Sequence, residues 1–402
     1  MRALIALFII SPLLALIQSI KHYKQAWAKN GLWLFIIFYG FTMVKPEAMD
    51  SYRYVLKLKN LYNMPLSWDN FIFHLYSEEG GKVDIYQPIV TYVLSFFTDN
   101  GNVLFAVYGL VFGYFYSRNI WLLIDQIKEY KMTNSLWVIL FTFACIIGFW
   151  ELNGVRMWTA AHIFFYGAFL SLVYKEKKGL IIALLSILVH FSFMLPVGLL
   201  LLFKFGRAPW RLTYFAYMFS FFIAELNIQA IQNTLLNYAP EFLLPKVDTY
   251  LGEEYIESVR GAVKEVNWYI IYYQKSLSWF IAIGITIIYF SKSFKISKAL
   301  KSLIGFSLLF LTVGNIVSQL PSGGRFLMVA QLFSLAFIFI YMLENKYSKT
   351  SRLLTMLTPL LVFYIIVSIR TSFNTITLGT VMTNPIIAIF AELPIPLIDL
   401  IK

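Results

Sequence analysis

Charged residues and cysteine are scarce in this chain of 402 residues. Only 13% of the residues are Asp, Glu, Lys or Arg, against about 25% in a soluble globular protein. The single cysteine, Cys145, lies inside an apolar run, so it excludes an internal disulfide and gives no redox motif. The four histidines are scattered over different segments and form no cluster with metal-ligand spacing. We therefore expect no metal ion and no cofactor.

Nucleotide-binding motifs are also missing. There is no Gly-x-x-x-x-Gly-Lys-Ser/Thr loop, so the sequence gives no sign of ATP hydrolysis. There is also no signature for binding a nucleotide sugar. The net charge of +12 does not indicate nucleic-acid binding, because the lysines do not cluster on one polar domain. We expect no nucleic-acid partner, and we interpret the charge as a signal of membrane topology.

Apolar residues dominate what is present. The chain is 59% hydrophobic and 18% aromatic, which predicts an all-α polytopic membrane protein with the lipid bilayer as its surroundings. We expect residues 1–402 to form a single transmembrane domain of about 10–12 helices. The predicted spans are 3–20, 31–44, 102–124, 135–150, 157–174, 211–226, 268–290, 302–320, 324–343 and 353–369, with an ambiguous apolar run at 179–203. No small-residue cleavage site follows the first run, so we interpret it as a retained span.

Lysine and arginine are concentrated in alternate connections, which predicts that these connections are cytoplasmic. They are 21–29, 118–131, 175–178, 204–211, 292–301 and 346–352. The N-terminus and the segments 45–101, 151–156, 227–267, 321–323 and 370–402 are then predicted to lie outside. This arrangement requires the run 86–97 to be interfacial or re-entrant. It also requires the run 179–203 to enter and leave on the cytoplasmic side, as a hairpin broken near His190 and Pro196.

Arg156 is the most informative single residue. It ends Glu151-Leu152-Asn153-Gly154-Val155-Arg156, the short polar break between two apolar runs, on the predicted outer side. A membrane-embedded guanidinium is costly without a partner, and its best partners are phosphates and carboxylates. Arg156 is therefore a candidate for binding a phosphorylated substrate. The alternative is a structural ion pair with Glu151.

Four further arginines are predicted to face outward: Arg53, Arg260, Arg325 and Arg370. Arg325 follows Gly323-Gly324 and opens the span 324–343. A glycine-rich helix start leaves backbone N–H groups and the positive end of the helix dipole free for an anion. The arginine completes a predicted pyrophosphate or phosphate site. The alternative is a side chain that anchors a helix end by snorkelling.

His190 lies inside the apolar run 179–203. An imidazole within the membrane is uncommon and its titration range suits proton transfer, so His190 is a candidate general base. The alternative is a hydrogen-bonded core histidine, which we favour for His162 because no helix break is predicted there.

Asp50, Tyr52, Arg53 and Tyr54 alternate acid, base and aromatic residues just past the second span. Aromatic faces and carboxylates bind sugars, and Asp50 could activate an acceptor hydroxyl. The alternative is an ordinary solvated turn. Asp84, in Asp84-Ile85-Tyr86, gives a weaker signal of the same kind.

Four short motifs occur in a fixed order: an Asp-x-Tyr-x-Tyr turn, an Asn-x-x-Arg, a His-Phe-Ser and a Gly-Arg-Phe. They are formed by Asp50, Tyr52 and Tyr54, by Asn153 and Arg156, by His190, Phe191 and Ser192, and by Gly324, Arg325 and Phe326. In these motifs, and in the late Asn384-Pro385, the chain resembles the EpsG-like branch of the Wzy polysaccharide polymerases.

That resemblance implies a membrane glycosyltransferase of the GT-C type, independent of metal, in the bacterial cytoplasmic membrane with its active site facing outward. The donor would be a glycan on undecaprenyl pyrophosphate, the acceptor one lipid-linked repeat unit, and a chain-length regulator protein a further partner. Arg156 and Arg325 would hold the pyrophosphate, and His190 or Asp50 would orient or deprotonate the acceptor hydroxyl. The expected substrate-binding residues are Arg53, Tyr52, Tyr54, Asn153, Gly324, Arg370 and Asp84.

Three other classes of function compete with the polymerase. A flippase for lipid-linked oligosaccharides would need charges along a cavity open to both faces, and usually an internal repeat, which this sequence lacks. An O-antigen ligase, or an acyltransferase acting on sugars, shares the expected layout and stays open as an alternative. A structural membrane subunit would leave Arg156, His190 and Arg325 without explanation.

Overall fold

The computed structural model describes residues 2–76, 84–127, 130–206, 209–223, 237, 267–291, 297–320, 322–391 and 393–401. The described residues form helices and contain no β-strand, apart from one isolated bridge between Thr377 and Pro396. The predicted all-α class is confirmed. The second predicted outer segment, 227–267, lies almost wholly outside the described residues, and Arg260 lies outside them too.

The N-terminal part consists of short helices. They are α1 (Arg2–Ile10), α2 (Pro12–Lys21), α3 (Ala28–Thr42), α4 (Asp50–Asn63), α5 (Trp68–Tyr76) and α6 (Tyr86–Ser95). The prediction of one continuous helix over 3–20 is wrong, because the chain breaks at Ser11. The Ser11 hydroxyl accepts the Leu14 N–H at 3.3 Å, and Pro12, which has no N–H, occupies the first position of α2.

The central part begins with the long helix α7 and continues through shorter pieces. They are α7 (Gly101–Ile124), α8 (Asn134–Ile146), η1 (Phe149–Gly154), α9 (Val155–Phe169), η2 (Leu170–Tyr174), α10 (Lys177–Val189), η3 (Phe191–Phe193), α11 (Met194–Gly206) and α12 (Trp210–Ser220). The C-terminal part holds α16 (Trp268–Tyr289), α17 (Lys298–Val317), α18 (Gly324–Glu344), α19 (Lys349–Met356), α20 (Thr358–Ser372), α21 (Leu378–Met382), α22 (Pro385–Phe390) and η5 (Leu397–Leu400).

Four described helical stretches are long and apolar enough to cross a membrane: Asn134–Tyr174, Trp268–Tyr289, Lys298–Val317 and Gly324–Glu344. The bent pair α19–α20 makes a fifth if it counts as one span. The first stretch has 41 residues and is divided by η1, the polar break that contains Glu151. These helices support a membrane protein, and the larger number of 10–12 spans stays a prediction.

The helix α6 covers most of the run predicted to be interfacial. Its ten residues are about 15 Å long, half of the hydrocarbon core of a bilayer, so α6 cannot span it. It packs against α4 within the predicted outer segment 45–101.

The run 179–203 folds as a helical hairpin. The chain leaves helical geometry at His190, whose backbone is extended, and α11 then returns until the Lys204 ammonium contacts the Ser171 hydroxyl at 2.8 Å. Both ends of the hairpin therefore lie beside η2, as the distribution of lysines predicted. Pro196 does not make the break, because it lies within the first turn of α11.

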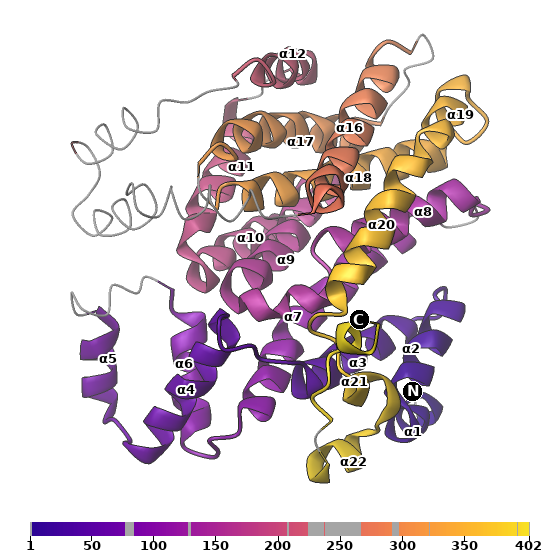
Figure 1. The fold of residues 1–402 in the computed structure, drawn as a ribbon. Helices are drawn as coiled ribbons and strands as arrows, with labels where there is room; N and C mark the ends of the chain where they lie inside the picture. Colours follow the sequence, from indigo (N-terminus) through magenta and orange to yellow (C-terminus); the bar gives the residue numbers. More distant parts are fainter. Residues whose placement is uncertain are drawn as a thin grey trace.

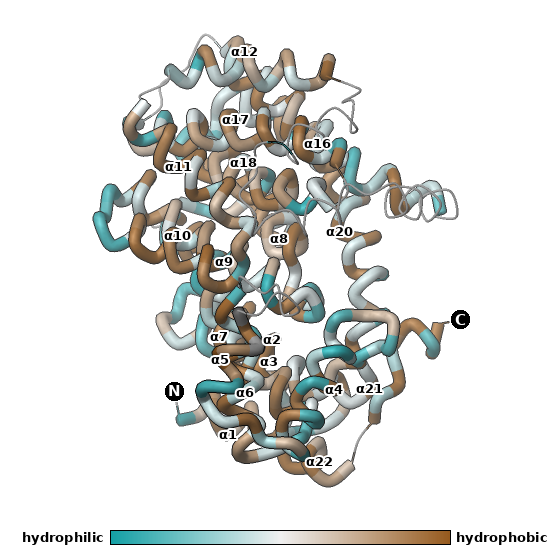
Figure 2. Tube along the Cα trace, turned by 90° about the vertical axis from the view of Figure 1, so that its left-hand side faces the viewer, coloured by the Kyte–Doolittle hydropathy of each residue, from teal (hydrophilic) through white to brown (hydrophobic). Residues whose placement is uncertain are grey.

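Figure 1 shows that α1–α6 gather below the helices α8–α20, with α7 between them, and that α21 and α22 return to the N-terminal group. The return is hydrogen-bonded: Tyr39 donates to the Thr375 hydroxyl at 2.8 Å, and Thr377 donates to the Thr42 carbonyl at 2.9 Å. The core continues into α18, where every residue from Val329 to Leu343 is buried. Figure 2 shows the apolar character of this helical region.

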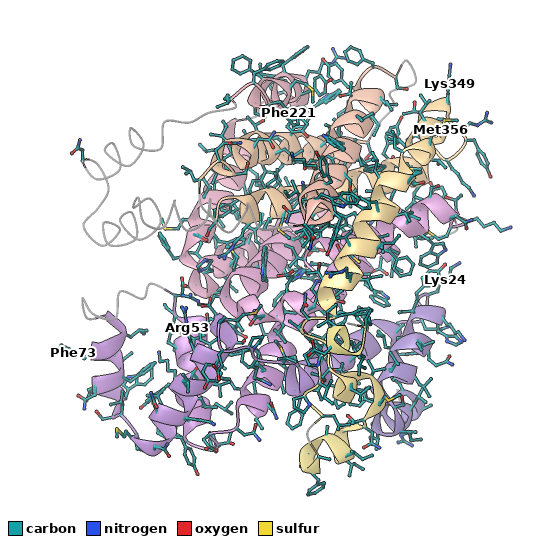
Figure 3. The ribbon with its side chains drawn as sticks, viewed as in Figure 1. Lys24, Arg53, Phe73, Phe221, Lys349 and Met356 are labelled. Atoms are coloured by element: carbon teal, nitrogen blue, oxygen red, sulfur yellow. The ribbon has the colours of Figure 1, made fainter. Side chains whose placement is uncertain are left out.

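Figure 3 shows that Lys24 and Lys349, both in connections predicted to be cytoplasmic, lie toward the right-hand side, whereas Arg53, predicted to be outside, lies left of the centre. The assignment of these residues to the two sides of a membrane stays a prediction.

Candidate functional site

Arg156 stands in the first turn of α9, directly after the turn η1. Gly154 ends η1 with the Trp158 ring packed against it, so closely that a Cβ there would lie 2.6 Å from a ring carbon. A larger residue would push Trp158 away and shift the start of α9. The glycine of the Asn153-Gly154 pair therefore serves the packing that places Arg156.

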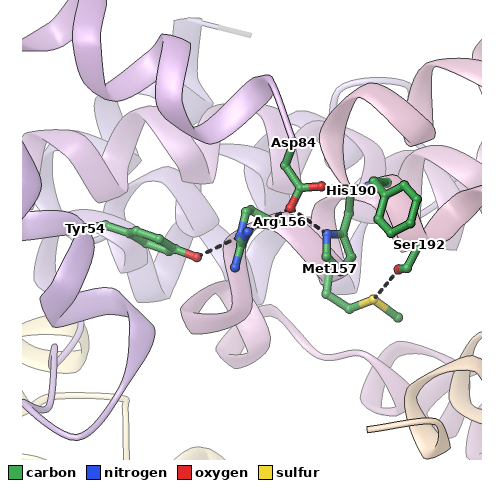
Figure 4. A network of polar contacts seen from close by, with 7 residues as sticks. Tyr54, Asp84, Arg156, Met157, His190 and Ser192 are labelled. Carbon is green, nitrogen blue, oxygen red and sulfur yellow. Dashed lines mark hydrogen bonds and ion pairs between the residues drawn. The ribbon is translucent and has the colours of Figure 1, made fainter. Parts of the chain in front are cut away.

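The partner of Arg156 is Asp84, from the loop before α6. The Arg156 Nη1 group donates to Asp84 Oδ2 at 2.8 Å, and Nε donates to the Tyr54 hydroxyl at 3.0 Å (Figure 4). The Asp84 side chain is 3% exposed and that of Arg156 is 31% exposed. The alternative of an Arg156–Glu151 ion pair is therefore wrong: the carboxylate comes from a segment 72 residues earlier.

His190 meets the same carboxylate from the tip of the hairpin. Its Nδ1 lies 2.9 Å from Asp84 Oδ2, and the backbone N–H of Phe191 donates to Asp84 Oδ1 at 2.8 Å (Figure 4). The Ile85 N–H also donates to the Leu188 carbonyl at 3.0 Å. The extended backbone at His190 both ends α10 and exposes the Phe191 N–H that the carboxylate needs.

The protonation state of Asp84 defines the tautomer of His190. Burial acts to raise the pKa of Asp84, but the hydrogen bond and charge of His190, the Phe191 N–H and the Arg156 charge outweigh it and lower that pKa to about 2. Asp84 is therefore ionised at neutral pH and can only accept hydrogen bonds. It follows that His190 Nδ1 carries the hydrogen, and that Nε2 carries the lone pair whenever the ring is neutral.

Tyr54 supports Arg156 from α4 and is itself supported by a buried polar layer. Its ring packs edge-on against Tyr108, with centroids 6.3 Å apart. The Tyr108 hydroxyl lies 2.8 Å from Thr91 Oγ1, which also receives the Gln87 amide at 2.9 Å. These contacts join α4, α6 and α7 beneath the guanidinium and hold its position.

The Glu151 carboxylate interacts with Arg325 and Trp158 and not with Arg156. The Trp158 side chain is hydrogen-bonded to Glu151, and the Arg325 charge acts on the same carboxylate. Arg325 is exposed in the first turn of α18, and the neighbouring Phe326 ring lies 6.4 Å from Phe193 in η3. The start of α18 therefore packs against the tip of the hairpin that carries His190.

Gly324 provides open space at this helix start, since a Cβ there would meet nothing within 4 Å. It is exposed, like Arg325. Among the described residues, Arg325 has no hydrogen bond from its guanidinium group, so its donors stay available.

The residues of the Asp50 turn lie on α4 near Arg156. Asp50 begins α4 and makes an exposed ion pair with Arg53 at 3.5 Å, an interaction worth little on a solvated surface. The Asp50 charge also acts on Arg156 and Tyr54. Tyr52 on the same helix is half-buried. The helix replaces the predicted turn, so Tyr54 faces the site while Arg53 faces away from it, 73% exposed.

Asn153 and Arg370 make other contacts. Asn153 donates to the Met49 sulfur at 2.6 Å, while its buried Oδ1 has no partner among the described residues. Arg370, in the last turn of α20, lies over the Tyr269 ring at 5.2 Å. The structure gives Arg370 no contact with Asp84, Arg156 or His190 among the described residues.

His162 is a core residue, as favoured from the sequence. It is 3% exposed, and its ring lies 3.2 Å from both the Asn119 amide and the Ile147 carbonyl. This contrasts with His190, which is 17% exposed and faces a carboxylate.

Asp84 lies at the centre of the site, although the sequence predicted only a minor substrate-binding role for it. The sequence shows an acid immediately before the apolar run 86–97, but it does not show the two distant partners of that acid.

No group of three or more potential metal ligands occurs among the described residues. What the arrangement offers chemically is an oriented imidazole, an anchored guanidinium and a second, exposed guanidinium. Comparison with family models, with curated proteins and with solved structures finds no match for this chain.

Proposed function

We propose that the protein is a polysaccharide polymerase with a GT-C-type architecture, acting at the outer face of a bacterial cytoplasmic membrane. It would transfer a growing glycan from undecaprenyl pyrophosphate onto a lipid-linked repeat unit. The observation that carries the proposal is the shared carboxylate of Asp84, which receives hydrogen bonds from Arg156 and from His190. One network thus holds a group suited to a pyrophosphate and a group suited to a hydroxyl proton.

The arginine side of the network fits a phosphorylated leaving group. Tyr54 and Asp84 engage two of the five guanidinium N–H groups of Arg156, which leaves the others for an incoming oxyanion. Arg325 adds an exposed guanidinium at the start of α18, close to the hairpin tip. Both would stabilise the charge that develops as undecaprenyl pyrophosphate departs.

The histidine side fits activation of the acceptor. The acceptor hydroxyl oxygen would attack the anomeric carbon of the donor glycan, forming the new glycosidic bond as the carbon–oxygen bond to pyrophosphate breaks. The hydroxyl proton would pass to Nε2 of His190, while Asp84 holds Nδ1–H and stabilises the resulting imidazolium. The pyrophosphate leaves as an anion, so a strong general acid is unnecessary.

Alanine substitution of Arg156 and of Arg325 tests the proposal. The variants are expressed in a polysaccharide-producing strain from which the gene has been deleted. Arg156→Ala and Arg325→Ala are expected to insert into the membrane normally but to fail to restore long chains. Arg352→Ala, which removes an exposed arginine on α19, is the matched control and is expected to retain them. Gel profiling of the surface polysaccharide gives the readout. Normal long chains from both site variants would refute the assigned roles.

The same gels separate the alternatives. Loss of a polymerase leaves single repeat units on the final acceptor, whereas loss of a ligase leaves that acceptor bare. Loss of a flippase leaves the lipid-linked units on the cytoplasmic side, where an externally added glycosidase cannot reach them in spheroplasts. A bare acceptor in the deletion strain would assign the protein to ligation instead.

A further inference from the structure

A cavity lined by several lysines lies away from Asp84. It has a volume of about 440 Å³ and forms where η2, the end of α11 and the first turn of α17 meet. Its lining includes three lysines, two serines and an indole: Lys175, Lys204, Lys301, Ser171, Ser302 and Trp210. No carboxylate lines it among the described residues. Its electrostatics therefore favour an anion.

The cavity is built by unusual backbone. The π-helical turn η2 ends at Lys175, which adopts a left-handed conformation with φ 58°. A residue other than glycine seldom takes this conformation. Lys175 is exposed and follows the buried Ser171 by four residues, and both line the cavity.

In the part of the chain that the structure describes, no ion pair joins Lys175, Lys204 or Lys301 to an acid. Lys204 donates to the Ser171 hydroxyl at 2.8 Å, a neutral partner that leaves its charge uncompensated. The nearest acid in sequence, Glu176, is paired with Lys178 at 2.9 Å. Three exposed ammonium groups therefore share one cavity, and their summed positive potential attracts an anion.

An apolar surface flanks the cavity. On α11, next to Lys204, Leu202 is 68% exposed and Phe205 is 78% exposed; on α12, next to Trp210, Leu212 is 63% exposed. An anion with acyl chains would cover both surfaces at once, and a free anion would leave the apolar one bare. The combination favours a lipid headgroup.

The position also suits a lipid. The 15 residues of α9 continue into the five residues of η2, so Ser171 lies about 24 Å and Lys175 about 30 Å from the start of α9. The second distance is about the thickness of a hydrocarbon core. The cavity is thus about as far from the Asp84 network as one headgroup layer is from the other.

We propose that this cavity binds the phosphate headgroup of an anionic phospholipid. The three lysines contact the phosphate oxygens, Ser171 and Ser302 provide hydroxyl groups, and Trp210 lies at the headgroup boundary, with the acyl chains along α11 and α12. The site is independent of the polymerase reaction and would exist in any of the alternative functions.

Lipid binding by the purified full-length protein tests this site. Native mass spectrometry in a mild non-ionic detergent would compare phosphatidylglycerol with phosphatidylcholine for three proteins: the wild type, the triple variant Lys175→Gln/Lys204→Gln/Lys301→Gln, and the control Lys24→Gln/Lys177→Gln/Lys349→Gln. The control removes the same charge from exposed lysines outside the cavity. We expect about a tenfold preference for phosphatidylglycerol in the wild type and control, and its loss in the triple variant.

The remaining outcomes overturn the proposal. Equal retention of the two lipids by the wild type would do so whether or not the variants fold. An unchanged preference in a folded triple variant would do so as well. If the triple Gln variant does not fold, the triple Arg variant must keep the preference for phosphatidylglycerol. A competition experiment with inorganic phosphate gives the final test. If inorganic phosphate displaces phosphatidylglycerol at equal concentration, the ligand is a free anion and the lipid assignment fails.

Discussion

Asp84 carries more interactions than any neighbouring side chain. Its two oxygens receive hydrogen bonds from Arg156, His190 and the Phe191 N–H, and it is almost fully buried. A buried carboxylate with three donors orients its partners, since each of them loses a charge-assisted hydrogen bond if it moves. Asp84 therefore acts through Arg156 and His190 and is a positioning residue.

Asp84→Asn is expected to reduce polymerisation strongly. The amide keeps the shape but removes the negative charge, and it no longer selects the Nδ1–H tautomer of His190. We expect the rate to fall about 10²-fold or more, the range lost with an oriented general base. Polymerisation of lipid-linked repeat units by the purified protein gives the measurement.

Asp50→Asn provides the matched control for that loss. Asp50 is an exposed acid whose ion pair with Arg53 is 3.5 Å long, so its substitution should change the rate severalfold at most. A greater loss in Asp50→Asn than in Asp84→Asn would assign the base-orienting carboxylate to Asp50 instead.

The low pKa of Asp84 predicts a specific pH dependence of stability. Its folded pKa of about 2 lies below the ordinary 3.8, so its contribution is fully present above pH 4 and is lost as the pH falls toward 2. The shift corresponds to about 2 kcal/mol. The Tm difference between wild type and Asp84→Asn should narrow as the pH falls from 4 toward 2. A Tm difference that stays unchanged down to pH 2 would contradict the assignment.

At the scale of elements, α9 and α10 depend on small residues where they touch. A Cβ on Gly179 would lie 2.6 Å from the Ser171 nitrogen, and one on Gly167 would collide with the Ala183 backbone. Backbones that approach this closely pack tightly in membrane proteins, where small residues replace the hydrophobic drive between helices. This contact holds the hairpin against α9 and so holds His190 opposite Arg156.

Gly167→Ala is expected to destabilise the protein, and Gly198→Ala is its control. Both substitutions raise helix propensity, but a Cβ on Gly198 meets nothing within 4 Å. We expect Gly167→Ala to cost about 1–3 kcal/mol of stability through overpacking and Gly198→Ala to cost nothing. Thermal unfolding in detergent measures both. Equal Tm values would show that the α9–α10 contact adjusts freely.

At the scale of the whole molecule, the expected sidedness can be tested with the lone thiol. Cys145 lies half-buried in α8, so Cys145→Ser gives a background without cysteine. In that background, Lys59→Cys on α4 should react with a membrane-impermeant maleimide on intact cells. Lys349→Cys at the start of α19 should react only after permeabilisation. Both positions are exposed, so the reverse pattern would invert the topology.

The sequence predicted much of the fold but few of the side-chain contacts in the candidate site. The lysine distribution alone required a hairpin over 179–203, since Lys204 had to return to the side of Lys175, and the structure contains that hairpin. Helix breaks at proline and polar residues were harder to predict. Ser11 and Pro12 divide an apolar run that was predicted to be one span. Sequence periodicity describes the faces of each helix and contains no information on contacts between distant segments.

The same limit explains the choice of partner for Arg156. Glu151 is five residues away and was the visible acid, whereas Asp84 lies 72 residues earlier and is brought to Arg156 by α6 and its packing on α4. Local sequence predicted a phosphate or a carboxylate as the partner of Arg156, and only the tertiary structure shows that Asp84 is the carboxylate.

The order of Asp84, Arg156 and His190 along the chain has a consequence for biogenesis. Asp84 is synthesised 106 residues before His190, so the translocon releases the carboxylate long before its last partner exists. Until α10 has been inserted, Asp84 lacks both the imidazole and the Phe191 N–H and is held only by Arg156. The network therefore closes after translation has passed the hairpin, and a nascent chain stalled before residue 190 lacks two of the three donors to Asp84.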